Sequence, residues 1–197
     1  MTVLCHDDLE QNSSEQASAR SQWRARVLFV GGGFQGVVGA WWLVRGLAPL
    51  TTWLVAGIFG AVVVLAGVTV TSSLLSSAPR PQGSEARRIE RRLTVATLVQ
   101  LSWTVLAPWG LAQLQWQRLS LPFIMASIGI LLVWIHREVD VPFQGTAGRL
   151  LIGLSIVTLA LSGTAQTAFA GLAAAAVLLG CAVASYHWLE HRLNEND

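Results

Sequence analysis

The chain has 197 residues, of which 53% are hydrophobic and 12% charged, and its formal net charge is +2. All 13 basic residues are Arg, so chemistry that needs a lysine, such as a Schiff base, is excluded. So small a charge, without a pattern of aromatic residues interleaved with basic ones, argues against nucleic-acid binding. Five stretches contain no Asp, Glu, Lys or Arg: 27–44, 46–79, 93–117, 119–135 and 150–189. Because about 20 apolar residues cross a hydrocarbon core, the sequence predicts an all-α membrane protein.

The N-terminal region, residues 1–25, is polar and carries several acids, so it predicts a disordered tail and no cleavable signal. The first membrane span is expected at 27–44, before Arg45. The second is expected at 50–75, after Pro49. Small residues at GxxxG spacing, Gly32 and Gly36, favour close helix packing in the first span.

A polar loop over 76–92 follows, in which Ser84 is expected to cap a helix that runs on into the third span, 93–112. Four arginines of this segment form i, i+4 pairs that can contact anionic lipid head groups: Arg87, Arg88, Arg91 and Arg92. Binding of a cytoplasmic protein partner is the alternative. The fourth span is expected at 121–135, with Pro122 in its first turn.

The last uncharged stretch divides at the polar residues 162–166 into a fifth span, 150–161, and a sixth, 167–188. The fifth is short and could extend back over 145–149. The six-helix membrane domain would then cover 26–189, with a polar C-terminal tail over 190–197. The glycine- and alanine-rich first, second and sixth spans are expected at the packed centre, and the bulkier third and fourth toward lipid or another subunit.

Arginine placement predicts the orientation of this domain. Six spans in three hairpins place both termini on one side, which receives eleven of the 13 arginines; the other side receives Arg45 and Arg118. Cytoplasmic loops hold the excess of Lys and Arg, so both termini are predicted to be cytoplasmic. The absence of Lys favours a GC-rich bacterial genome, and therefore a bacterial cytoplasmic membrane.

Neutral polar residues recur at a similar depth in three predicted spans. Gln35, Gln100 and Thr158 would each lie roughly 12 Å from the cytoplasmic edge at 1.5 Å per residue. Trp103 lies one turn beyond Gln100 and could wall a binding pocket for an uncharged or lipophilic molecule. The alternative is that these residues only form hydrogen bonds between helices, worth about 0.6 kcal/mol each.

The one sharp motif is His187-Trp188-Leu189-Glu190-His191, whose H-x-x-E-H form resembles the zinc-binding string of inverted zinc peptidases. On a helix the two histidines share a face, and His136 lies on the same predicted side of the membrane. The alternative is an ordinary interfacial helix end, where His and Trp are common.

The predicted spans contain no carboxylate, Lys or Arg, which argues against a proton pump. In size and helix number the chain resembles the small membrane substrate-binding subunits of vitamin importers, a likeness of architecture alone. The expected function is a small binding or transport protein, or a membrane subunit of a larger complex or homo-oligomer, with no cofactor. The alternatives are an interfacial membrane enzyme that uses cytoplasmic histidines and a scaffold without a small ligand.

Overall fold

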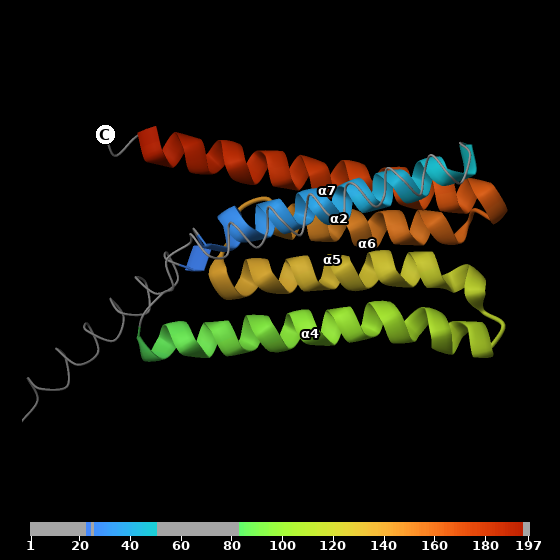
Figure 1. Ribbon diagram of the computed structural model, residues 1–197, viewed down its shortest axis with the longest axis horizontal. Coiled ribbons are helices and arrows are strands. Elements are labelled where there is room, and N and C mark those ends of the chain that lie inside the picture. Colours follow the sequence, from blue (N-terminus) through green and yellow to red (C-terminus); the bar gives the residue numbers. More distant parts are fainter. Residues whose placement is uncertain (1–22, 25, 51–82, 195–197) are drawn as a thin grey trace, which may run out of the picture.

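The computed structural model describes residues 23, 24, 26–50 and 83–194, and these residues are helical, joined by short turns. The all-α prediction is therefore confirmed for this part of the chain. The elements in chain order are η1 (Val27–Gly31, a π-helical segment), α2 (Gly32–Leu47), η2 (Ala48–Leu50), α4 (Ser84–Gln113), η3 (Gln117–Leu119), α5 (Ser120–Val139), α6 (Gln144–Leu159) and α7 (Gly163–Asn194). Helices α4, α5, α6 and α7 pack in chain order, and α2 lies against α7 (Figure 1).

Three of these helical segments are long and apolar enough to cross a membrane. They are Ser84–Gln113, Gln117–Val139 and Gly163–Trp188, while Gln144–Ala160 is apolar but shorter. Apart from Leu50, the predicted second span, 50–75, lies outside the described residues, as does the tail 1–22. The six spans and the side of the membrane on which the termini lie therefore remain predictions.

The starts of α4 and α6 can be compared with the starts predicted from the charged residues. Helix α4 begins at Ser84, so the basic segment and the third span form one helix, as expected. Ser84 is not its N-cap, however: Gly83 occupies that position with φ 110°, and no side-chain cap forms. Helix α6 begins at Gln144, six residues before the predicted start at Leu150. The prediction stopped at the charge of Arg149, but this exposed side chain is accommodated on the surface of the helix.

Helices α2 and α7 pack antiparallel through small residues. A Cβ atom added at Gly39 would lie 2.9 Å from Leu179 Cγ, and one at Gly46 would lie 2.7 Å from the backbone nitrogen of Leu172. At the start of α2, Gly32 faces Ser185, which lies near the end of α7. The predicted close contact between the first and sixth spans is therefore confirmed.

A second glycine contact joins α5 to α6. A Cβ added at Gly129 would lie 2.6 Å from the carbonyl oxygen of Gly148, and one added at Gly148 would lie 2.5 Å from that of Gly129. Met125 and Leu132 of α5 are buried in the core beside this contact. Helix α5, which was expected to face lipid or another subunit, therefore also packs closely against α6. No GxxxG signal indicates this contact, because neither Gly129 nor Gly148 has a second glycine four residues away.

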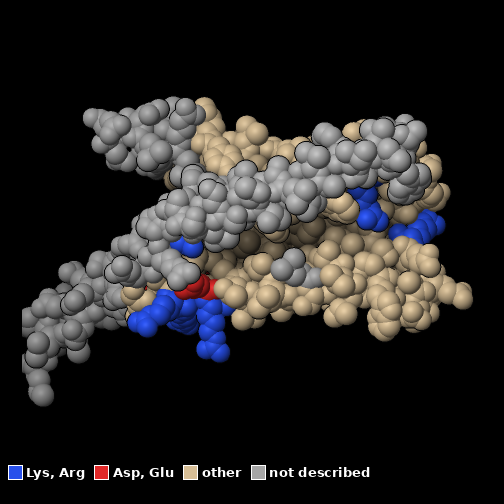
Figure 2. Space-filling model, in the orientation of Figure 1, with Lys and Arg blue, Asp and Glu red and all other residues tan. Residues whose placement is uncertain are grey.

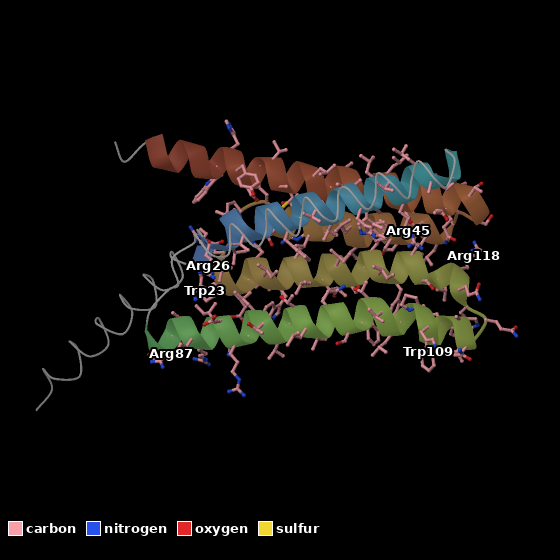
Figure 3. The ribbon with its side chains drawn as sticks, in the orientation of Figure 1. Trp23, Arg26, Arg45, Arg87, Trp109 and Arg118 are labelled. Atoms are coloured by element: carbon pink, nitrogen blue, oxygen red, sulfur yellow. The ribbon has the colours of Figure 1, made fainter. Side chains whose placement is uncertain are left out.

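Arginines gather at the two ends of the bundle. Helices α2, α4 and α6 begin at one end, here called the basic end, where α5 and α7 finish (Figure 1). Figure 3 shows Arg26 and Arg87 at this end and Arg45 and Arg118 at the opposite end. The face drawn in Figure 2 carries its charged side chains near the ends and an uncharged surface between them. The described arginines of the basic end are Arg24, Arg26, Arg87, Arg88, Arg91, Arg92, Arg137, Arg149 and Arg192.

Candidate functional site

Two residues of the predicted polar layer lie at the interface of α4 and α5. The amide nitrogen of Gln100 donates hydrogen bonds to Ser127 Oγ (2.9 Å) and to Thr104 Oγ1 (3.3 Å). The ring of Trp103 lies 5.4 Å from that of Phe123, between centroids, at an interplanar angle of 35°. These contacts join α4 to α5.

Thr158 lies elsewhere. It is the penultimate residue of α6, roughly 21 Å along the helix axis from Gln144 at 1.5 Å per residue. Its predicted depth is therefore wrong, because the helix begins earlier than the sequence indicated. The Thr158 carbonyl accepts a hydrogen bond from Gln166 Nε2 (3.1 Å), which also donates to the Arg118 carbonyl (3.0 Å). Thr158 thus belongs to a network at the opposite end of the bundle.

Gln35, the remaining residue of the predicted polar layer, is buried, and its side-chain hydrogen bonding is incomplete. It lies on α2 with 5% of its surface exposed, and its Oε1 has no hydrogen-bond partner among the residues that the structure describes. Gln144, at the start of α6, is 1% exposed, and its Oε1 is likewise unpartnered. A buried polar atom without a partner costs about 1–3 kcal/mol. Sequence analysis missed Gln144 because it was assigned to a loop, where a glutamine draws no attention.

The structure does not bring the four layer residues to one pocket. Gln100 and Trp103 contact α5, Thr158 lies at the opposite end, and Gln35 lies on α2, with its Oε1 unpartnered among the described residues. A role of these residues in ligand binding remains a prediction.

The histidines proposed as metal ligands have separate surroundings. His136 Nδ1 lies 2.9 Å from the Val141 carbonyl and its ring packs against Gly145, at the turn between α5 and α6. His187 is exposed on α7, and the side chains of Glu190 and His191 lie outside the described residues. Within the described residues, no group of three or more His, Cys, Asp or Glu side chains could hold a metal ion.

The basic end is held together by contacts from the segment that precedes η1. Trp23 is buried, and its indole nitrogen donates to the Ala86 carbonyl of α4 (3.0 Å). Arg24 Nη2 lies 2.6 Å from Asp140 Oδ2, at the end of α5. These two contacts link the segment to the helices on either side of it.

An open groove of about 610 Å³ lies beside these contacts, between the first turns of α4 and the last turns of α5. Its apolar wall is formed by Val95, Ala96 and Trp134. Its polar lining consists of Arg88, Arg91, Arg92 and Glu138. Three of the four arginines predicted to contact lipid therefore line one site. The fourth, Arg87, is not among the lining residues and donates from Nε to the Gly83 carbonyl (3.4 Å).

In this groove charged and apolar side chains share one open surface. Arg92 Nη1 lies 3.1 Å from both carboxylate oxygens of Glu138, which neutralises one arginine. Arg88 makes a longer contact with Glu85, 3.7 Å, on its own helix. Comparison of the chain with protein-family models, curated proteins and solved structures finds no match.

Proposed function

We propose that this chain is a multi-pass integral membrane protein that binds a lipophilic molecule, alone or as a membrane subunit of a larger complex, with its basic end in the cytoplasm. The observation that carries this proposal is the exposure of α4. No residue of its most apolar 18-residue window is buried. Water would disfavour so large an apolar surface, whereas acyl chains or a neighbouring membrane helix would not.

The side chains of α4 divide into two faces. The outward face carries large apolar residues that are 45–71% exposed: Val95, Leu98, Val99, Trp103, Val105, Leu106 and Trp109. Gln100 and Thr104 are half-buried toward α5. Thr97 and Ser102 are exposed among the apolar residues, whereas the amide of Gln100 is turned toward α5, which is the arrangement expected of a lipid-facing helix.

Binding is favoured over interfacial catalysis because the apolar face and the groove offer a surface for an amphiphile. His136, in contrast, is already engaged by the Val141 carbonyl and Gly145. The position of the groove at the ends of two apolar helices supports binding of a ligand at the membrane interface.

Cysteine labelling of α4 tests the membrane placement. In a background with Cys5→Ser and Cys181→Ala, single cysteines would replace Ser84 and Leu114, which lie at opposite ends of α4 and are both exposed. We expect an impermeant maleimide to label Leu114→Cys in intact cells, and to label Ser84→Cys only after permeabilisation.

Val99→Cys is the matched control, because Val99 lies in the middle of α4 and is 62% exposed. In a bilayer this position should resist a water-soluble maleimide, since lipid excludes both the reagent and the thiolate. Rapid labelling of Val99→Cys in native membranes, or labelling of both ends of α4 from the same side, would show that α4 does not cross the bilayer.

A further inference from the structure

We infer that the groove between α4 and α5 is a binding site for one anionic phospholipid of the cytoplasmic leaflet. The phosphate would lie against Arg88 and Arg91, and an acyl chain would run along Val95, Ala96 and Trp134. This inference rests on the proposed membrane placement and gives the ligand of that function a chemical class.

Charge in the groove selects an anion. The lining holds three arginines and one glutamate, so its formal charge is +2. Arg92 and Glu138 neutralise each other at 3.1 Å. Arg91 is exposed and has no ion pair with any residue of the described ranges, and Arg88 is 61% exposed at 3.7 Å from Glu85. Two guanidinium groups are therefore available, and guanidinium matches the geometry of phosphate oxygens.

The order of residues along α4 matches the order of groups in a phospholipid. Arg88, Arg91, Arg92, Val95 and Ala96 recur at helical spacing, so they share one face. Four residues separate Arg91 from Val95, a rise of about 6 Å. The helix thus passes within one turn from guanidinium groups to apolar side chains, as a lipid passes from its phosphate to its acyl chains.

Trp134 closes the apolar side of the site from α5. It is half-buried, lies one turn before Glu138, and lines the groove with it. Tryptophan is enriched at the level of the head groups, where an apolar ring with one polar edge is stable. An acidic peptide would satisfy the arginines but not this apolar wall, so a lipid explains more of the lining than a protein partner does.

Native mass spectrometry of the full-length protein in neutral detergent tests the inference. Phosphatidylglycerol and phosphatidylcholine with identical acyl chains would be titrated against wild type and Arg88→Gln/Arg91→Gln. We expect wild type to bind one phosphatidylglycerol in preference to phosphatidylcholine. At about 1 kcal/mol per charge, the double variant should lose about 30-fold in affinity for the anionic lipid.

The matched control is Arg87→Gln/Arg137→Gln, which removes two arginines from the same end of the bundle without touching the groove lining. It should change phosphatidylglycerol affinity less than threefold. Glu138→Gln should tighten binding by about fivefold, because it releases Arg92 from its carboxylate partner. Equal losses in the two double variants would overturn the inference, since the effect would then come from net charge alone.

Two further arms identify the source of the anion. Glycerol 3-phosphate at the same concentration should not compete with phosphatidylglycerol, because it lacks the acyl chain that the apolar wall contacts. Equal binding of glycerol 3-phosphate, or of an acidic peptide such as tetraglutamate, would overturn the lipid assignment. Failure of this test, with α4 labelled from opposite sides as described above, would refute the lipid site while the membrane placement stood.

Discussion

Buried glutamines are the residues at which this chain departs most from a simple apolar bundle. Gln100 places its amide nitrogen between two hydroxyl groups, Ser127 Oγ at 2.9 Å and Thr104 Oγ1 at 3.3 Å. Gln35 is 5% exposed and its Oε1 accepts no hydrogen bond. Two residues of the same type, both predicted from sequence to line one pocket, therefore have opposite energetic roles in the structure.

These roles predict opposite effects of the same substitution. Gln35→Met keeps the side-chain length and removes an unsatisfied acceptor, so it should raise the free energy of unfolding by about 1 kcal/mol. Gln100→Met removes an interhelical hydrogen bond and should lower it by about 0.6 kcal/mol. Thermal unfolding in detergent should show a melting temperature that rises a few degrees for the first variant and falls for the second.

Each variant serves as the control for the other, because each exchanges a glutamine for a methionine within a helix. A Gln35→Met protein that melts below wild type would mean that the amide oxygen has a donor in the native protein. The predicted ligand-binding role of Gln35 would then gain support, and its unpartnered state in the structure would mark a site that a bound molecule completes.

At the scale of the helical elements, glycine sets which helices pack closely. The α5–α6 contact brings the backbones of Gly129 and Gly148 together, and the α2–α7 contact does the same for Gly46 and Gly171. Other glycines of these helices have empty space around them: a Cβ added at Gly153 or Gly180 would meet nothing within 4 Å. The sequence alone does not distinguish these glycines. The structure divides them into glycines that lie against the backbone of a neighbouring helix and glycines that do not.

Alanine substitution should distinguish these classes. Gly148→Ala and Gly171→Ala force backbones apart, and overpacking of this kind costs about 1–3 kcal/mol. Gly153→Ala and Gly180→Ala, on the same two helices, should be neutral or stabilising by up to about 1 kcal/mol because alanine favours the helix. The measurement is the midpoint of unfolding in a series of denaturing detergent mixtures. Equal midpoints for all four variants would show that neither glycine contact determines the packing.

Apolar stretches and their charged ends were enough to predict the helices, and they were less informative about how the helices pack. The α2–α7 contact was foreseen because Gly32 and Gly36 repeat at helical spacing. The α5–α6 contact was not, because Gly129 and Gly148 each stand alone among large residues. Among the site residues, Arg88, Arg91 and Arg92 were chosen for their charge and do line one groove. Trp134 and Glu138 of the same groove come from α5, and the spacing of residues within one helix cannot reveal such a contribution from a second helix.

At the scale of the whole molecule, the described arginines divide between the two ends as nine and two. Figure 3 shows the labelled members of both groups, with Arg26 and Arg87 far from Arg45 and Arg118. The sequence predicted this division from the number of spans, and the antiparallel order of the helices reproduces it in space. Because positive residues are retained in the cytoplasm during insertion, the division predicts one orientation of the protein in the membrane.

Moving three positive charges along α4 should weaken that orientation. Arg87, Arg88 and Arg91 would be replaced by Gln, and Gln113, Gln115 and Gln117 at the other end of the helix by Arg. The net charge is unchanged, but the predicted division of the 13 arginines between the two sides falls from eleven and two to eight and five. With the Leu114→Cys reporter, we expect the fraction labelled from outside intact cells to fall below that of the unmodified chain, because the excess of arginine that retains the basic end drops from nine to three.

The control carries only the three Arg→Gln replacements. It keeps eight arginines on the predicted cytoplasmic side against two on the other, so its labelling should stay close to that of the unmodified chain. Equal losses in the control and the exchanged variant would mean that the basic segment acts through lipid binding in the groove rather than through the balance of charge. Unchanged labelling in both would mean that other parts of the chain set the orientation. Labelling of position 114 thus separates two roles of the same arginines, one in binding a lipid and one in orienting the bundle.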